Sequence, residues 1–137
     1  ALSLDDQLAE AHAAVGSYAA LDWDWSGAEK SLTRAVQLAP GWAHGHLMYA
    51  MMCLVPTGRI RQATGEMLRA HELDPLTRIT RSMLAEVLYF NRDYSRAIPE
   101  FEDLVKSDRA APPAAGRYWL SLGLSGQEGR AIEVWGA

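Results

Sequence analysis

The sequence has 137 residues, of which 49% are hydrophobic and 22% charged, and this composition predicts one folded domain rather than a disordered chain. Acidic residues outnumber basic ones by 17 to 13, and the resulting net charge of -4 argues against nucleic acid as a partner. Apolar runs are too short to span a membrane, and the single cysteine, Cys53, has no partner for an intrachain disulfide. We therefore expect a cytoplasmic protein with no membrane partner.

Hydrophobic periodicity and helix-capping residues predict eight helices and no strand. In chain order the helices are expected at residues 8–21, 27–38, 43–54, 60–73, 77–90, 94–106, 114–124 and 127–135. Ser26, with Glu29 three residues later, fits a capping box for the second helix. Pro99 falls inside the sixth helix, where its missing amide hydrogen predicts a bend or a late helix start.

The predicted helices repeat in pairs. Alanine recurs at a nearly constant interval at Ala28, Ala63, Ala97 and Ala131. Small residues come before three of these alanines, at Gly16, Ala50 and Ala85, and large apolar residues follow each by four, at Leu32, Met67, Phe101 and Trp135. The first interval is one residue longer than the next two, which predicts one extra residue, and we expect it in the loop around Pro56 and Gly58.

A second alanine stands seven residues after the first at Ala35 and Ala70, and proline closes the unit at Pro40 and Pro75. Together with the interval between units, this pattern resembles the tetratricopeptide repeat (TPR) family, whose unit has about 34 residues. The resemblance implies an all-α, right-handed superhelix of about four helix-turn-helix units, an α-solenoid. The units would cover residues 9–42, 43–77, 78–111 and a truncated 112–137, with residues 1–8 ending a preceding repeat, in a single domain cut from a larger protein.

Residues that could carry chemistry do not cluster in the sequence. His44 and His46 are two residues apart on a helix and therefore face different sides, so they cannot bind one metal ion together. Cys53 lies on an apolar stripe, and no sequence neighbour would activate it. Glu100 and Glu102 fit a solvated helix face, in i, i+4 pairs with Arg96 and Lys106. We expect no enzymatic activity, cofactor or metal in this segment.

In the family, the first helix of each unit lines a concave groove that receives a segment of a partner. By this resemblance the groove residues here are His44, Leu47, Met48, Met51, Met83, Glu86 and Tyr89. Ala13 and Ser17 stand where the chaperone-binding members carry the lysine and asparagine of a carboxylate clamp, so that function is not supported. Met52 and Met67 are expected in the core, whereas for the groove methionines the sequence leaves surface and interhelix packing open.

Two tryptophans have no expected place in the core. Trp23 stands where other units have Gly58 and Gly126, and it is either a lid on the first helix pair or an exposed contact. Trp135 lies in the last helix with Ile132, and no further unit follows to cover them. We expect that this helix is frayed or covered by another copy of the chain, in a weak self-association that belongs to the fragment.

The segment DWDWSGAEK, followed by a closing LAP or LDP, also looks like the repeat tails of bacterial class III adenylate or guanylate cyclases and of winged-helix regulators. The expected function is therefore a non-catalytic protein–protein interaction scaffold in a bacterial signalling or regulatory protein, for which a cyclase is one candidate. Its groove would bind a protein or peptide segment, or another domain of the same chain. The alternative is a self-association module that brings catalytic domains together.

Overall fold

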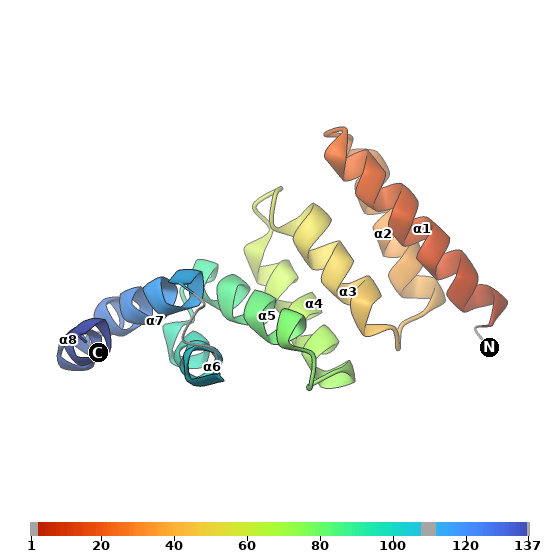
Figure 1. Cartoon of the computed structure of the whole chain (residues 1–137). Coiled ribbons are helices and arrows are strands. Elements are labelled where there is room, and N and C mark those ends of the chain that lie inside the picture. The colour runs from red at the N-terminus through yellow and green to blue at the C-terminus, as the bar shows by residue number, and fades with distance from the viewer. Residues whose placement is uncertain (1–2, 108–111, 137) are drawn as a thin grey trace. The chain divides into compact units, whose positions relative to one another are not determined.

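The computed structural model describes residues 3–107 and 112–136. Within these ranges the chain forms eight α-helices, one π-helical turn and no strand, as the sequence predicted (Figure 1). It divides into two compact units, the N-terminal unit Ala1–Pro75 and the C-terminal unit Leu76–Ala137. None of the described helices is both long and apolar enough to cross a membrane.

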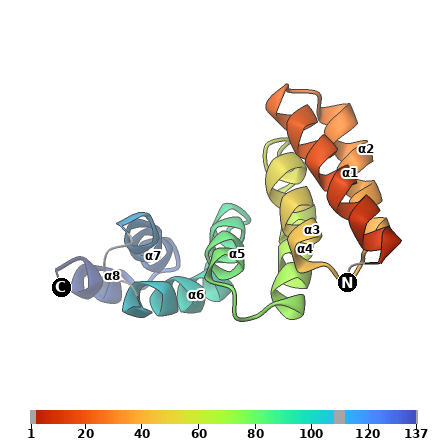
Figure 2. The same ribbon diagram turned by 45° about the vertical axis from the view of Figure 1, so that its right-hand side comes forward.

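The N-terminal unit holds two helix pairs. Helix α1 (Leu4–Leu21) packs along α2 (Trp25–Leu38), and α3 (Ala43–Tyr49) runs through the π-helical turn η1 (Ala50–Leu54) before the chain returns in α4 (Ile60–Leu73). The α3–η1 segment also contacts both α1 and α2, so the second pair is stacked on the first (Figure 2). Stacking of this kind stabilises helices that are too short to be stable alone.

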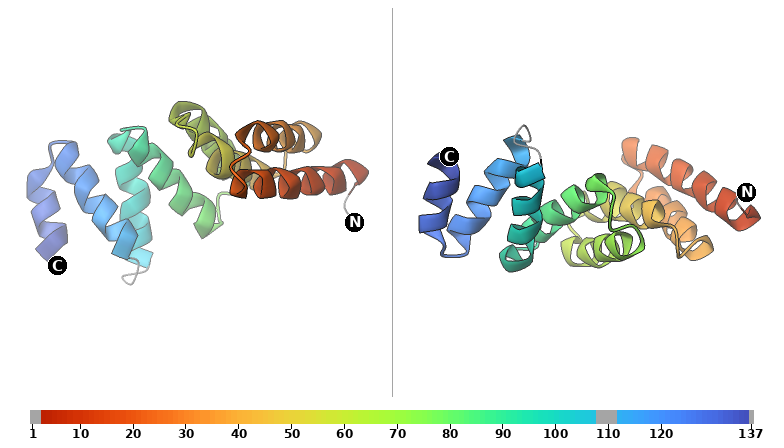
Figure 3. Two further views of the ribbon diagram at one scale, coloured as in Figure 1. Left: turned by 90° about the horizontal axis from the view of Figure 1, so that it is seen from above. Right: turned by 60° about the horizontal axis from the view of Figure 1, so that its bottom comes forward.

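The C-terminal unit repeats the arrangement with α5 (Arg78–Phe90), α6 (Tyr94–Ser107), α7 (Pro112–Leu124) and α8 (Glu128–Gly136). Helix α5 pairs with α6 and α7 with α8, while α7 also packs against α6 and α5 (Figure 3). Pro99 lies inside α6, which begins at Tyr94, so of the two predicted alternatives the late start is wrong and the bend stays a prediction. Pro99 and Ser95 are both exposed, so water can satisfy the carbonyl group that the proline leaves without a helical partner.

The recurring small residues are the points where paired helices meet most closely. Ala28, Ala63 and Ala97 have no exposed surface. A Cβ atom added to Gly16 on α1 would lie 2.6 Å from Leu32 Cγ on α2, so a larger side chain cannot be accommodated without movement. The large apolar residues four positions after the alanines, Leu32, Met67 and Phe101, are buried as the repeat pattern predicted.

Helices α1, α2 and α7 begin earlier than predicted, and for α1 and α2 the reason is that other residues cap them. Ser3 and Asp6 form a capping box at the start of α1, so residues 4–8 belong to this helix and the predicted start at residue 8 is wrong. Asp24 caps α2 by accepting a hydrogen bond of 2.9 Å from the amide of Gly27. The predicted capping box of Ser26 and Glu29 is therefore wrong, because Ser26 already lies within the first turn.

Each of the four turns inside the helix pairs contains one residue whose backbone is in the left-handed region. The backbone angle φ is 62° at Trp23, 77° at Gly58, 60° at Arg92 and 81° at Gly126. Each turn is closed by the same bond, in which the amide of the next residue donates to a carbonyl five residues earlier, at distances of 2.8 to 2.9 Å. Trp23 and Arg92 therefore stand where glycine is the least strained residue.

We expect that Arg92→Gly raises the free energy of unfolding by about 0.5–1 kcal/mol, because glycine removes the strain of a Cβ atom at positive φ. Gly126→Arg at the equivalent turn should lower it by a similar amount. Urea denaturation followed by circular dichroism measures both changes. Equal effects of the two substitutions, in the same direction, would contradict this account of the turns.

The extra residue of the second repeat lies in η1. The prediction that it lies in the loop around Pro56 and Gly58 is therefore wrong. Gly16 and Ala50 are separated by the ordinary repeat interval, but Ala19 and Leu54, which accept the same turn-closing bond, are one residue further apart. The insertion therefore falls between Ala50 and Leu54. There the amide of Val55 donates to the carbonyl of Ala50, five residues back, at 2.9 Å, and this wider turn takes in one residue.

Candidate functional site

Four of the expected groove residues lie on α3 and η1 of the N-terminal unit. His44 is exposed, and its ring lies 5.7 Å from the ring of Trp42. Met48 and Met51 are half-buried and so present part of their side chains to solvent. Leu47 is only 6% exposed, so its assignment to the groove surface is wrong, because its side chain points into the core of the unit.

The other three expected residues, Met83, Glu86 and Tyr89, are half-buried on α5 of the C-terminal unit. The centroid of the Tyr89 ring lies 5.7 Å from that of the Phe90 ring and 5.9 Å from that of the Tyr94 ring. Glu86 accepts a hydrogen bond of 3.0 Å from Arg117 on α7, and this pair neutralises its charge. The face of α5 therefore combines aromatic and thioether surface with one paired carboxylate.

The sequence had left open whether the groove methionines are surface or packing residues. Met48, Met51 and Met83 are each partly exposed, so each is accessible to a ligand while it also packs against the unit. Met52 was expected in the core but is also partly exposed, because it lies within the inserted π-helical turn. Two adjacent methionines thus reach the surface of η1, whereas Met67 is fully buried as predicted.

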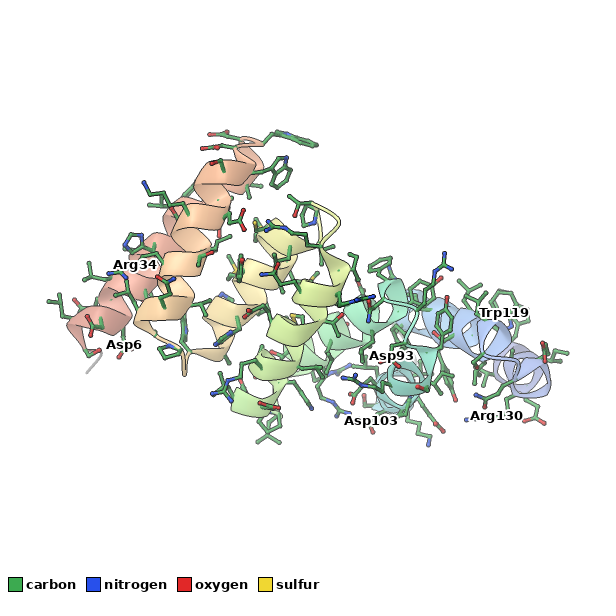
Figure 4. All side chains as sticks on the ribbon, turned by 180° about the vertical axis from the view of Figure 1, so that it is seen from behind. Asp6, Arg34, Asp93, Asp103, Trp119 and Arg130 are labelled. Atoms are coloured by element: carbon green, nitrogen blue, oxygen red, sulfur yellow. The ribbon has the colours of Figure 1, made fainter. Side chains whose placement is uncertain are left out.

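Both singled-out tryptophans are exposed. Trp23 is 78% exposed and meets Trp25 edge to face at 5.8 Å, so it covers little of the first helix pair. Trp135 is 72% exposed, and its ring lies 5.0 Å from that of Trp119 on α7, which Figure 4 labels. Helix α8 continues to Gly136, against the expected fraying. The roles of both side chains as contacts stay predictions.

A partly buried polar triad in the N-terminal unit was missed by the sequence analysis. The Nδ1 atom of His46 lies 2.6 Å from Glu66 Oε2 on α4, and its Nε2 atom lies 2.8 Å from the carbonyl oxygen of Pro40. The hydrogen bond to Glu66 raises the pKa of His46 above its usual value of 6.5, although burial opposes this shift. His46 thus fastens α3 to α4 and to the turn before α3.

Cys53 is fully buried, as expected, and burial raises the pKa of its thiol, which disfavours the nucleophilic thiolate. Arg59 donates a hydrogen bond of 3.3 Å to its Sγ atom and also pairs with Glu29 on α2. These contacts tie the turn before α4 to α2. In residues 3–107 and 112–136, no group of three histidine, cysteine or acidic residues is arranged to hold a metal ion.

The predicted carboxylate pairs on α6 are half correct. Glu102 pairs with Lys106 at 2.9 Å, as expected. Glu100 pairs with Arg81 of α5 at 3.3 Å rather than with Arg96, and Arg81 also reaches Asp103 at 2.6 Å. The two ion pairs of Arg81 join α5 to α6, whereas the pair of Glu102 and Lys106 lies within α6.

No protein-family model and no curated protein matches the sequence. Solved structures do match the fold. MamA RS-1, as its ArsTM double mutant, is 16% identical with a TM-score of 0.84, over 98% of this chain and 73% of that chain. YrrB, described as a TPR protein with an unusual peptide-binding site, is 17% identical with a TM-score of 0.81, over 92% and 64%. The TPR2B domain of yeast Sti1, in complex with pHsp70, is 21% identical with a TM-score of 0.72, over 84% and 96%. Identities this low show the fold alone.

Proposed function

We propose that this chain, which has the tetratricopeptide-repeat fold, is a non-catalytic protein–protein interaction module that binds a partner segment on its first-helix face. The observation that carries the proposal is the partly exposed thioether surface of Met48 and Met51 on α3 and η1 of the N-terminal unit. The C-terminal unit has a thioether and aromatic surface of its own, formed by Met83 and Tyr89 on α5. Flexible methionine side chains adapt to apolar partners of different shapes. The complex of the Sti1 domain with pHsp70 and the peptide-binding site described for YrrB support the same use of the fold.

The partner is proposed to be an apolar segment of another protein or of another domain of the same chain. The paired state of Glu86 supports an apolar rather than a charged contact, because its carboxylate already bonds to Arg117. The resemblance of DWDWSGAEK to cyclase repeat tails supports a parent among bacterial signalling proteins that act in the cytoplasm. The alternative of a self-association module relies on other surfaces of the chain.

We expect that Met51→Asp weakens binding by at least about tenfold, because a charge on a desolvated apolar contact costs binding energy. The probes are peptides selected from a random display library on the immobilised chain. Fluorescence anisotropy measures their affinity, and circular dichroism confirms that helicity is retained. Gln37→Asp, which places the same charge on the exposed side of α2, is the matched control and should bind as the wild type does.

Two outcomes would contradict the proposal. Unchanged affinity in Met51→Asp would show that η1 is not part of the binding face. A joint loss of binding and of the folded state would show that Met51 serves the core instead, because its charge then costs folding energy.

A further inference from the structure

The second helix pair holds its basic side chains with carboxylates of its own. His46 Nδ1 on α3 lies 2.6 Å from Glu66 Oε2 on α4, and Arg69 pairs with Glu72 at 3.2 Å within α4. The third pair repeats the first of these contacts, because an arginine of α5 and a glutamate of α6 form an ion pair of 3.3 Å at the equivalent positions. A carboxylate of the second helix is therefore the ordinary partner of this position on the first helix.

The first helix pair keeps the basic residues but lacks both carboxylates. One repeat before the basic residues of the second pair stand His12 on α1 and Arg34 on α2. Where α4 has its two glutamates, α2 has Ser31 and Gln37. Lys30, one helical turn before Arg34, adds a further charge where α4 has a glycine. Within residues 3–107 and 112–136, neither Lys30 nor Arg34 forms an ion pair.

These five side chains line a hollow of about 620 Å³ between α1 and α2, in the region that Arg34 marks in Figure 4. Thr33 and Glu29 complete its lining. Glu29 is the only carboxylate among these described residues, and it already pairs with Arg59. The hollow thus offers two positive charges together with hydroxyl, amide and imidazole groups that can donate hydrogen bonds to an anion.

The hollow stays open when another helix pair is stacked before its own. Lys30, Arg34 and Gln37 are exposed at its edge. Their equivalents on α4 are exposed as well, although the α1–α2 pair precedes the second pair and packs against it. The side of α2 that carries these charges is therefore one that a neighbouring pair leaves uncovered.

We infer that this hollow binds an acidic segment of a protein partner, whose carboxylates take the places that Glu66 and Glu72 fill in the second pair. Arg34 and Lys30 bind them through charge-assisted hydrogen bonds, and the imidazole of His12 donates an N–H from inside the hollow. A carboxylate is inferred because a carboxylate fills the equivalent place in the second and third pairs. This goes beyond the proposed function, because the hollow includes no residue of the first-helix face on α3, η1 or α5.

A short acidic peptide tests the inference on the whole chain. The probe is a fluorescein-labelled peptide of alternating glutamate and glycine, and the same peptide with glutamine in place of glutamate is its control. Fluorescence anisotropy is measured at about 50 mM salt, with protein up to about 1 mM. We expect the acidic peptide to bind at least about tenfold more tightly than its control. The net charge of -4 opposes general attraction of an acidic peptide, so binding points to a local site.

Removing the charges at the hollow should weaken this binding. Arg34→Gln and Lys30→Gln are each expected to weaken it by at least about threefold, because each removes one charge from an exposed contact. Arg61→Gln, which removes the same charge from an exposed arginine of α4 outside the hollow, is the matched control and should bind as the wild type does.

Restoring the missing carboxylate should close the site. Ser31→Glu places a carboxylate where Glu66 stands in the second pair, so it should occupy His12 and Arg34 and abolish binding of the acidic peptide. Ser26→Glu makes the same substitution at an exposed residue in the first turn of α2 and should leave binding unchanged. Circular dichroism checks that both variants are folded, and Gln37→Glu replaces Ser31→Glu if that variant is not.

Four outcomes would each overturn the inference: no binding of the acidic peptide, normal binding by Ser31→Glu, equal weakening in Arg34→Gln and Arg61→Gln, or displacement of the peptide by inorganic phosphate as readily as by unlabelled acidic peptide. The last of these would show a site for any small anion. Library peptides that depend on Met51 should bind all these variants normally, which separates this test from that of the proposed function.

Discussion

Replacing Phe101 with alanine is expected to lower the free energy of unfolding of the C-terminal unit by about 3–5 kcal/mol. The side chain is 1% exposed and belongs to α6, which packs against both α5 and α7. Its removal forfeits the transfer free energy of a phenyl group and leaves a cavity that helices on both sides cannot close fully. Urea denaturation followed by circular dichroism measures the change.

Trp135→Ala is the matched control, because Trp135 occupies the same repeat position in the next unit but is 72% exposed. We expect this substitution to lower the free energy of unfolding by less than about 1 kcal/mol, because the side chain loses only its aromatic contact with Trp119. The comparison is made at low micromolar concentration, followed by circular dichroism, so that association does not contribute. If both substitutions cost the same, the repeat position and not the covering helix decides stability, and our account of α7 is wrong.

Replacing His46 with alanine is expected to cost about 3 kcal/mol in the N-terminal unit. The substitution leaves the carbonyl of Pro40 and the carboxylate of Glu66 without the imidazole that bonds to both. The side chain of Glu66 is 24% exposed, so water recovers only part of this loss. Thermal unfolding followed by circular dichroism measures the effect, and a loss below about 1 kcal/mol would show that the triad is solvated in solution.

The same triad predicts how stability depends on pH. The Pro40 carbonyl can only accept, so Nε2 of His46 donates to it, and Nδ1 then bonds to the Glu66 carboxylate only when the ring carries both protons. Because the pKa of His46 is raised in the folded state, its contribution is complete below pH 6.5, the ordinary value of the unfolded chain. It is lost as pH rises through the folded pKa. The free energy of unfolding, measured from pH 6 upward, should therefore contain a contribution from His46 that decreases as pH rises.

Glu66→Gln provides the control for this pH dependence. A glutamine amide can donate to Nδ1 of a neutral ring, so the hydrogen bond remains while the ion pair is gone. We expect that this variant keeps most of the stability and loses the falling component above pH 6.5. A pH profile identical to that of the wild type would assign the dependence to other groups.

The sequence predicted those features that depend on a short stretch of chain. The bounds of α4 agree with the prediction at both ends, since Ile60 follows a glycine turn and Leu73 ends the apolar periodicity. The cap of α2 was misplaced by two residues because Ser26 and Asp24 are both good caps, and only the folded turn decides between them.

The features that sequence reasoning missed depend on contacts between distant residues. His46 and Glu66 are 20 residues apart, and Glu86 and Arg117 are 31 apart, so neither pair has a signal in the local sequence. Leu47 was placed on the surface by analogy with other repeats, whereas burial by the neighbouring helices decides its position. Met52 was likewise misplaced. It is partly exposed because the extra residue lies in η1, whereas the sequence analysis had placed that residue in the loop.

The π-helical turn at Ala50–Leu54 absorbs the extra residue of the second repeat, so the residues after it keep the orientation that they have in the other repeats. One added residue would rotate every later side chain of a regular α-helix by about 100°, since 3.6 residues make a turn. Here the change is absorbed within five residues, and Leu54 returns to the buried position that Leu88 and Leu122 hold in later repeats. The second repeat thus carries an additional surface side chain, one of two neighbouring methionines, without altering how its helices stack. A solenoid can in this way add a surface residue to the first helix of one repeat while it keeps its period.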